Sequence, residues 1–352
     1  MEQKRVLSGK NLEEMQALCA ELGFKKFAAK QVCEWIYKKK VRQIDLMTNL
    51  SLKDRERLAQ TAEVGIRDPL QSWQSTDGTK KYLFASIDPQ KPLSEPKFIE
   101  SVMIPDGDRA TLCVSSQSGC RMNCAFCATG SQGFNHHLPV EQIMNQILAV
   151  PETDKLTNIV FMGMGEPFDN TGNVLKALEV LTAPWGLAWS PTRITVSTVG
   201  ILPQTRRFLD ESRCHLAISL HDPFPAERAA LMPVEKTWPV KETVEILKTY
   251  DWRGQRRVSF EYILIDGFND TPAHALATAK LLQGLPCRVN LINYHHVPGK
   301  PYEKSSPRKT EAFQKTLQEK GITCTLRKSR GEDIMAACGL LAKTKAKKAV
   351  CR

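Results

Sequence analysis

The stretch "GCRMNCAFCATG", residues 119–130, places three cysteines within eight residues, at Cys120, Cys124 and Cys127. It directly follows the apolar run "ATLCVSS" (110–116), which reads as a strand, so the three thiols are expected on a loop after a strand. A tetrahedral structural zinc site takes four protein ligands, usually as two pairs. Three thiolates can instead hold an iron-sulfur cube with one iron left open for a small molecule. The spacing favours the cluster, and structural zinc with Cys113, His136 or His137 as fourth ligand stays open.

The length and charge of the chain restrict its class. Its 352 residues suffice for one large catalytic domain plus a smaller module. No apolar run approaches the roughly 18 residues of a membrane span, and "MEQKRVLSGK" lacks the apolar segment of a secretory signal. We therefore expect a cytoplasmic protein without a membrane partner, whose eleven cysteines are thiols or metal ligands. The net charge of +11 favours a polyanionic partner such as nucleic acid.

Residues 1–95 are predicted to form a small N-terminal helical accessory domain with a linker. Apolar residues recur at helical spacing over 11–24 and 28–40, and a strand is expected at 80–87. Ser51 is a plausible N-cap, with Asp54 at the position that completes a capping box for a helix over 51–60. This unit is expected to help dock a folded RNA stem, and residues 343–352 are predicted to be a basic tail.

Residues 96–342 are predicted to form an α/β catalytic domain, a partial or full (β/α) barrel. Short apolar runs alternate with helical stretches, as in strand-helix units around a mostly parallel sheet. The chemistry is expected at the carboxyl ends of the strands. The predicted strands are 110–116, 158–163, 193–198, 215–220, 258–265, 288–295 and 323–330, and the predicted helices are 139–150, 173–182, 240–250, 272–284 and 308–321.

Several further motifs carry a specific resemblance. CxxxCxxC with an aromatic residue, Phe126, before the last cysteine is the signature of radical-SAM enzymes. The likeness continues through "FMGMGEPFDN" (161–170), "ITVSTVGI" (194–201), "AISLHDPF" (217–224), "RAALMPVE" (228–235) and "SRGEDIMAACG" (329–339). From about residue 20 to residue 340 the chain resembles the RlmN and Cfr group of radical-SAM adenine methyltransferases that act on RNA.

The resemblance implies cofactors and catalytic residues. Cys120, Cys124 and Cys127 are implied to hold a 4Fe-4S cluster that binds S-adenosylmethionine, of which two molecules are used per turnover. The first methylates Cys338; the second is cleaved to a radical that activates this methyl group for addition to the adenine ring. Cys113 is implied to attack the Cys338 sulfur and release the methylated base from a covalent protein-RNA adduct. Glu100 is implied as the proton acceptor, a role that an apolar pocket would favour.

The same resemblance implies a set of S-adenosylmethionine contacts. Glu166 is expected to pair with the ammonium group of this cofactor. The family most often has an asparagine where this chain has His295, and a histidine can donate a similar hydrogen bond. The implied cofactor-binding residues are Gly165, Glu166, Ser197, Ser219, Leu220, His221 and His295.

The implied reaction is methylation of carbon 2 of an adenosine in 23S ribosomal RNA, at the peptidyl-transferase centre. An adenosine in tRNA is a second target in some family members, and a flavodoxin- or ferredoxin-type protein is the implied electron donor. "GMGEPF", "SQSGC" and "SQGFN" are closer to RlmN. The alternatives are Cfr-like methylation of carbon 8, linked to antibiotic resistance, and a non-catalytic, zinc-stapled RNA-binding protein. Basic residues, among them Arg256 and Arg327 to Arg330, are candidates for phosphate contacts.

Overall fold

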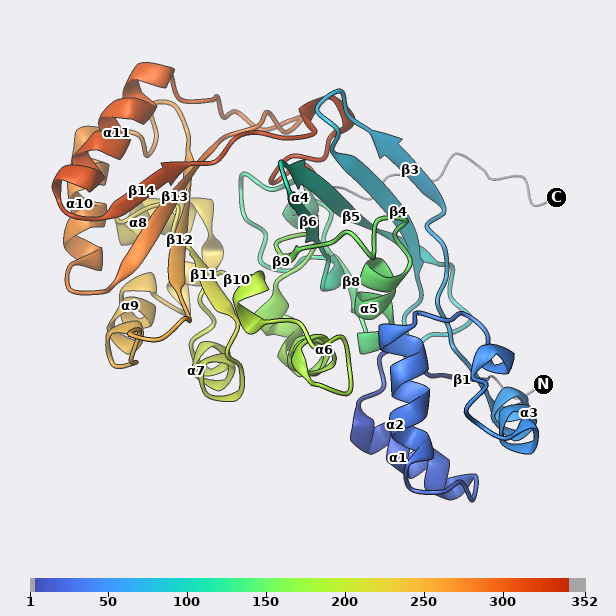
Figure 1. Cartoon of the computed structure of the whole chain (residues 1–352). Coiled ribbons are helices and arrows are strands. Elements are labelled where there is room, and N and C mark those ends of the chain that lie inside the picture. Colours follow the sequence, from blue (N-terminus) through green and yellow to red (C-terminus); the bar gives the residue numbers. More distant parts are fainter. Residues whose placement is uncertain (1–3, 342–352) are drawn as a thin grey trace.

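The computed structural model describes residues 4–341, so the predicted basic tail at 343–352 lies outside the described residues (Figure 1). A ten-stranded sheet runs through the molecule in the order β14-β13-β12-β11-β10-β9-β6-β5-β4-β3. Strands β6 and β9 to β14 are parallel to one another, whereas β3, β4 and β5 pair in antiparallel fashion. Because β14 and β3 are edge strands, the sheet is open. Of the two predicted forms, a partial and a full barrel, the structure has the partial barrel.

The bounds of the elements are as follows. The main sheet contains β3 (Gln71–Gln74), β4 (Lys80–Ser86), β5 (Lys97–Asp106), β6 (Arg109–Cys113), β9 (Asn158–Phe161), β10 (Ile194–Thr198), β11 (His215–Ser219), β12 (Val258–Leu264), β13 (Cys287–Asn293) and β14 (Thr323–Leu326). The helices that accompany it are α4 (Ala128–Ser131), α5 (Val140–Leu148), α6 (Thr171–Thr182), α7 (Leu202–Glu211), α8 (Pro225–Leu231), α9 (Val240–Lys248), α10 (Pro272–Leu282) and α11 (Pro307–Glu319). Two small sheets pair β1 (Arg5–Val6) with β2 (Ala62–Glu63), and β7 (Gln117–Gly119) with β8 (Phe134–His137).

The core lies between the parallel strands and the helices. Strand β11 is a short apolar run whose Leu216, Ala217 and Ile218 are all completely buried, as expected for a parallel strand covered on both faces. Figure 1 shows helices α6, α7, α9, α10 and α11 along the outer side of these strands. All seven predicted barrel strands and all five predicted barrel helices are present. Helices α7 and α8 were not predicted, because "LPQTRRFLDE" is mostly polar and α8 is short.

The N-terminal helices pack against the barrel. They are α1 (Leu12–Glu21), α2 (Ala28–Cys33), a π-helical turn (Glu34–Lys38) and α3 (Leu52–Thr61). Ser51 caps α3 as predicted, since its hydroxyl accepts a 3.1 Å hydrogen bond from the Asp54 N–H. Polar contacts then join the unit to the barrel: Asn11 Nδ2 donates to Glu179 Oε2 (3.1 Å), and Lys40 pairs with Asp154 (2.5 Å).

Strands β3 and β4 lie before residue 95, yet they belong to the barrel's sheet. Strand β4 pairs with β5 along its whole length, from Lys80 opposite Met103 to Ser86 opposite Lys97. The catalytic sheet therefore begins before the predicted boundary at 95, and assigning β3 and β4 to a helical unit was wrong. Within residues 4–341 we find no helix with both the length and the apolar composition that a membrane span requires.

Candidate active site

One cavity of about 660 Å³ opens at the carboxyl ends of the parallel strands, where a barrel of this kind carries its chemistry. Residues at or just beyond the ends of β6, β9, β10, β11, β13 and β14 contribute to its wall. Glu100 and Leu220 are not among the residues that line it. The predicted site residues that do line it are Cys113, Cys120, Cys124, Cys127, Gly165, Glu166, Ser197, Ser219, His221, His295 and Cys338.

The three clustered cysteines lie on the loop between β7 and α4. The main chain fixes this loop, because the Cys120 N–H donates to the Gly133 carbonyl (3.1 Å) and the Cys127 N–H to the Cys124 carbonyl (3.2 Å). Burial raises the pKa of Cys120 to about 12, and burial also raises the pKa of Cys124 well above its usual range. Thiolates at such a site need a bound cation, so the loop is suited to a metal centre.

The spacing of these thiols distinguishes a cluster from a single zinc ion. Four ligands at about 2.3 Å around zinc bring sulfur atoms within ~3.8 Å of one another. Among residues 4–341, only Asp222, Glu227 and His274 form a set of three His, Cys, Asp or Glu side chains whose ligand atoms all lie within 4.8 Å of one another. At least two of the three loop thiols therefore lie more than 4.8 Å apart, which is farther than one zinc ion requires. This spacing fits a multi-iron cluster.

Both histidines considered as a fourth zinc ligand have other partners. His136 Nε2 lies 2.7 Å from the Ser86 hydroxyl, and His137 Nδ1 lies 3.0 Å from Gln117 Nε2. Neither ring lines the cavity that holds the cysteines. The structure therefore does not bring His136 or His137 to the three thiols.

Cys113 and Cys338 both line the cavity, beside a partly buried cation. Cys113 ends β6 and is 9% exposed, whereas Cys338 is exposed. Burial raises the pKa of Cys113 to about 12; the neighbouring Cys338 raises it further and the Arg327 guanidinium opposes the rise. Arg327 also lines the cavity, and its Nη1 lies 3.3 Å from Glu261 Oε2. A partly buried guanidinium close to both sulfur atoms stabilises whichever one carries negative charge.

Sequence reasoning had treated Arg327 only as a candidate phosphate contact, and the structure gives it this place beside the thiols. Its position just after β14, at a strand's carboxyl end, was a signal that could have identified it. Arg256, another candidate for a phosphate contact, donates through its guanidinium to the carbonyls of Cys214 (3.2 Å) and Leu209 (2.8 Å), and its role toward RNA stays a prediction.

Glu100 lies on β5, completely buried. Its carboxylate pairs with Lys81 Nζ at 3.1 Å, and the same ammonium donates to the Met335 carbonyl at 3.4 Å. Glu100 is thus connected through Lys81 to the segment that carries Cys338, although it does not line the cavity. Its role as proton acceptor stays a prediction.

Glu166 is held rigidly at the cavity wall. Its Oε1 accepts from the Phe168 N–H (2.9 Å) and its Oε2 from the Val199 N–H (3.0 Å). Burial raises the pKa of Glu166 to about 7, which a bound ammonium group would oppose. The preceding Gly165 has φ +98°, and a Cβ there would lie 2.5 Å from the Gln117 Cβ. Only glycine fits this turn.

His221 is neutral and has a defined tautomer. Its Nδ1 accepts a 3.0 Å hydrogen bond from the Ile263 N–H, so the proton must sit on Nε2. Burial lowers the pKa of His221 to about 3, and the nearby Arg228 lowers it further. The centroid of its ring lies 4.8 Å from that of Phe126, in an edge-on contact. Phe126 lies between the second and third clustered cysteines in the sequence. Leu220, in contrast, is completely buried away from the cavity.

His295 faces the Cys338 segment. Its Nδ1 lies 3.4 Å from Glu332 Oε1, and its Nε2 lies 3.4 Å from the Ser329 hydroxyl. Burial lowers the pKa of His295, which favours the neutral ring. The ring therefore belongs to the cavity wall and contacts polar groups of the segment that carries Cys338, and its contact with the cofactor stays a prediction.

A buried arginine, overlooked by sequence reasoning, ties the strand ends together. Arg228 is completely buried and donates to the carbonyls of Leu220 (2.9 Å), Val199 (3.0 Å) and Ser219 (2.8 Å). The Arg228 guanidinium also forms a buried ion pair with the Glu235 carboxylate. These two residues are the first and last of "RAALMPVE" (228–235). This motif contributed to the resemblance, but no role had been assigned to its residues. The pair holds the ends of β10 and β11 in place below the cavity.

The comparisons with known proteins agree with this geometry. The model of the Radical SAM superfamily matches residues 114–279, and that of the "Ribosomal RNA large subunit methyltransferase N-terminal domain" matches residues 6–64. A protein of Parabacteroides distasonis, named "Probable dual-specificity RNA methyltransferase RlmN", is 53% identical over 98% of both chains. The "Dual-specificity RNA methyltransferase RlmN" of Syntrophus aciditrophicus is 39% identical over 94% of both.

The chain belongs to the RlmN family. A crystal structure of a radical SAM methyltransferase from Sphaerobacter thermophilus superimposes with a TM-score of 0.88 at 36% identity, covering 97% of this chain and all of the other. An RlmN-family enzyme uses a 4Fe-4S cluster and S-adenosylmethionine. The three widely spaced thiols of the β7–α4 loop fit that cluster, and the adjoining cavity fits the cofactor.

Proposed function

We propose that this enzyme methylates carbon 2 of an adenosine in 23S ribosomal RNA, with tRNA as a second substrate. The observation that carries the proposal is the meeting of Cys113 and Cys338 in the one cavity that also holds Cys120, Cys124 and Cys127. The relatives described above are named dual-specificity RNA methyltransferases, which supports two RNA substrates. They carry the name RlmN, which supports carbon 2 over the carbon 8 alternative.

The substrate's chemistry explains why a cluster is needed. Carbon 2 of adenine lies between two nitrogens and is electron-poor, so it does not attack an electrophilic methyl group. When bound, the cluster and S-adenosylmethionine together supply the one-electron chemistry that activates a methyl carbon. In this proposal Cys120, Cys124 and Cys127 hold the cluster, while Gly165, Glu166, Ser197, Ser219, His221 and His295 orient the cofactor at the cavity wall.

The two remaining cysteines divide the work on the methyl group. Exposed Cys338 carries the methyl and, after the new carbon-carbon bond has formed, is linked through that carbon to the RNA. The Cys113 thiolate then attacks the Cys338 sulfur. A Cys113–Cys338 sulfur-sulfur bond forms, the carbon-sulfur bond breaks, and its electron pair stays on the carbon, which a proton converts to the methyl group. Arg327 stabilises the attacking thiolate.

Glu100 is proposed to accept the proton that carbon 2 loses before this release, and the one electron that the ring must lose with this proton would pass to the bound cluster. Support comes from the chain of contacts through Lys81 to the Met335 carbonyl, three residues before Cys338. A carboxylate and an ammonium at 3.1 Å in a buried place can move a proton between them without a large change in net charge.

The cellular setting follows from the substrate. We propose that the enzyme works in the cytoplasm, where bacterial ribosomal RNA and tRNA are found. A flavodoxin- or ferredoxin-type protein is proposed to deliver the electrons that the cluster requires. The net charge of +11 supports binding to RNA phosphates through counterion release.

Nucleoside mass spectrometry tests the proposal. Ribosomal RNA and tRNA from cells with and without the gene are digested, and methylated adenosines are separated by position. We expect 2-methyladenosine to disappear from both RNAs without the gene, and to return with the wild-type gene but not with Cys338→Ala. Loss of 8-methyladenosine instead would identify the carbon 8 reaction, and unchanged nucleosides would refute methylation of these RNAs.

A further inference from the structure

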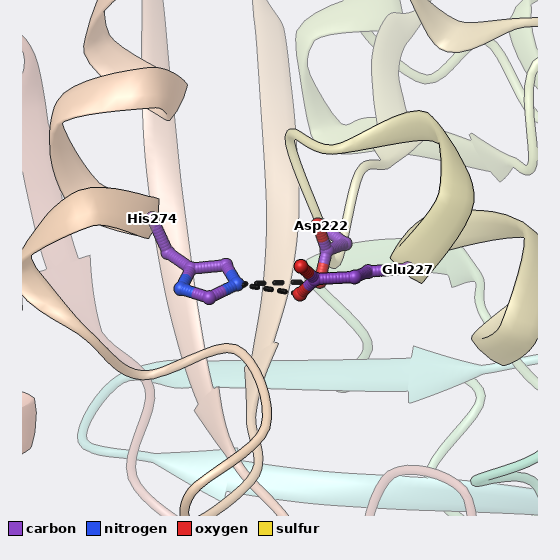
Figure 2. Close-up of side chains that lie close together, drawn as sticks. All are labelled: Asp222, Glu227 and His274. Carbon is purple, nitrogen blue, oxygen red and sulfur yellow. Dashed lines mark hydrogen bonds and ion pairs between the residues drawn. The ribbon is translucent and has the colours of Figure 1, made fainter.

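A second cluster of metal-ligating side chains lies outside the active-site cavity. Figure 2 shows Asp222, Glu227 and His274 pointing toward one another from three different segments. Asp222 lies on the loop after β11, Glu227 lies in α8, and His274 lies in the first turn of α10. None of the three side chains lines the cavity described above.

The distances between these side chains are those of a preformed ligand set. His274 Nε2 lies 2.8 Å from Glu227 Oε2 and 3.8 Å from Asp222 Oδ2, and all three ligand atoms lie within 4.8 Å of one another. Tetrahedral ligands at about 2.0–2.1 Å from zinc are separated by ~3.3 Å. The separations of 2.8 Å and 3.8 Å bracket this value, so small side-chain shifts would suffice to bind an ion.

Asp222 is the observation that points to a ligand. Its side chain is completely buried, and its Oδ1 accepts from the Phe224 N–H at 2.8 Å. Its Oδ2, which faces His274, has no hydrogen-bond partner. A buried carboxylate oxygen without a partner is costly, and a cation beside it would remove the cost. Burial raises the pKa of Asp222 to about 7, which agrees with a missing positive charge.

His274 is oriented as metal-binding histidines are. Its Nδ1 lies 2.6 Å from the Thr271 hydroxyl, which also caps α10 by accepting from the His274 N–H. In the structure Nε2 donates to Glu227 Oε2. On metal binding this proton would leave, and with Nδ1 donating to the Thr271 hydroxyl the Nε2 lone pair would face the ion. The Phe224 ring packs edge-on against the imidazole at 5.0 Å and fixes its plane.

We propose that Asp222, Glu227 and His274 bind a divalent transition-metal ion such as Zn²⁺, distinct from the cluster held by the cysteines. Imidazole and carboxylate groups are both ligands of such an ion, and a site with three protein ligands takes water in the fourth position. The Glu227 side chain is 44% exposed, so water and the ion can reach the site from that side.

The bound ion would have a structural role next to the active site. It would join the loop after β11 to α8 and α10. Without the ion, these three residues are connected only by the His274–Glu227 hydrogen bond and the longer His274–Asp222 contact. Asp222 directly follows His221, and Asn269, shortly before α10, donates to the His221 carbonyl at 2.6 Å. The ion therefore would fix the loop that places His221 at the cavity wall.

Zinc analysis of the cluster-loaded full-length enzyme tests the proposal. The wild type, His274→Gln and Glu227→Gln are incubated anaerobically with ZnCl₂, freed of loosely bound metal by a weak chelator, and analysed for zinc and iron. We expect the wild type to retain about one more zinc ion per chain than either variant, and Zn²⁺ to raise the melting temperature of the wild type only. Iron is expected to be equal in all, since the variants leave the cysteines intact.

Matched controls separate this site from zinc bound to thiols. His296→Gln removes an exposed imidazole and Glu242→Gln an exposed carboxylate, and both are expected to retain zinc like the wild type. Glu227 is half-exposed, so its variant is expected to fold even if a variant of a buried residue does not. Equal zinc in the wild type, His274→Gln and Glu227→Gln, or no zinc retained by the wild type, would overturn the proposal.

Discussion

The backbone N–H of Ala128 donates a 2.8 Å hydrogen bond to the carbonyl oxygen of Gly339. The first residue directly follows the last clustered cysteine, Cys127, and the second directly follows Cys338. The Thr129 hydroxyl adds a second bond to the Leu341 carbonyl at 2.7 Å. The position of the proposed methyl carrier relative to the cluster loop is therefore set by main-chain contacts between segments far apart in sequence.

Removal of Cys113 is expected to trap RNA on the protein. In Cys113→Ala, the carbon-sulfur bond to Cys338 has no thiolate to break it, so RNA stays attached through Cys338. Gel electrophoresis under denaturing conditions, followed by nuclease digestion and peptide mass spectrometry, detects the adduct. Cys113→Ala/Cys338→Ala is expected to carry no RNA, and Cys287→Ala, a thiol outside the cavity, to behave like the wild type. Purification of Cys113→Ala without attached RNA would contradict the resolving role.

Glu100→Gln is expected to accumulate the same adduct while its cluster stays intact. If Glu100 accepts the proton from carbon 2, the amide stops the reaction after the carbon-carbon bond has formed and before release. A loss of turnover of at least ~100-fold is expected, the lower range for a general base. Iron analysis and the adduct assay are run together, with Glu242→Gln as an exposed control. Normal turnover in Glu100→Gln would show that another group takes the proton.

The barrel was predictable from the sequence because its signal is local. Each parallel strand is a short apolar run followed by a helix, as in His215–Ser219, and such runs are visible without tertiary information. The placement of β3 and β4 was not, because β5, the strand that joins them to the barrel's sheet, was not among the predicted strands and the segment before it read as a linker. A stretch beside a helical unit gives no local sign of which sheet it joins.

The functional site was likewise predictable in part from the sequence. The cysteines, Glu166 and His221 were predicted from motifs, and the structure places them in one cavity. Arg228 could not be assigned a role, because an arginine in a helix normally lies on the surface. Only the fold shows that its guanidinium is buried against three carbonyls and Glu235. The Asp222 site had no sequence signal either, since its members come from three separate elements.

Arg327→Gln is expected to slow the alkylation of Cys113. Burial raises the pKa of this thiol to about 12 and Arg327 opposes the rise, so loss of the guanidinium raises the pKa further. The thiolate is the reactive form; at any pH below the pKa, a higher pKa means less thiolate, about tenfold less per unit. Iodoacetamide labelling of the Cys113 peptide over about pH 7–10 measures this by mass spectrometry. Arg327→Lys keeps a charge and is expected to react faster than Arg327→Gln. Equal rates in Arg327→Gln and the wild type would refute the electrostatic role.

Arg228→Met is expected to be strongly destabilising, by about 3–5 kcal/mol, because it leaves the Glu235 carboxylate buried without its cation. Arg228→Met/Glu235→Leu is expected to be more stable than this single variant, since no buried charge remains, and less stable than the wild type, since three carbonyls lose their donor. Urea unfolding followed by circular dichroism gives the three free energies. Arg207→Gln, which breaks the exposed pair with Glu211, is the matched control and is expected to change stability by less than about 1 kcal/mol. If Arg228→Met is no less stable than Arg207→Gln, the buried pair does not hold the ends of β10 and β11, and the placement of Ser219 and His221 must have another cause.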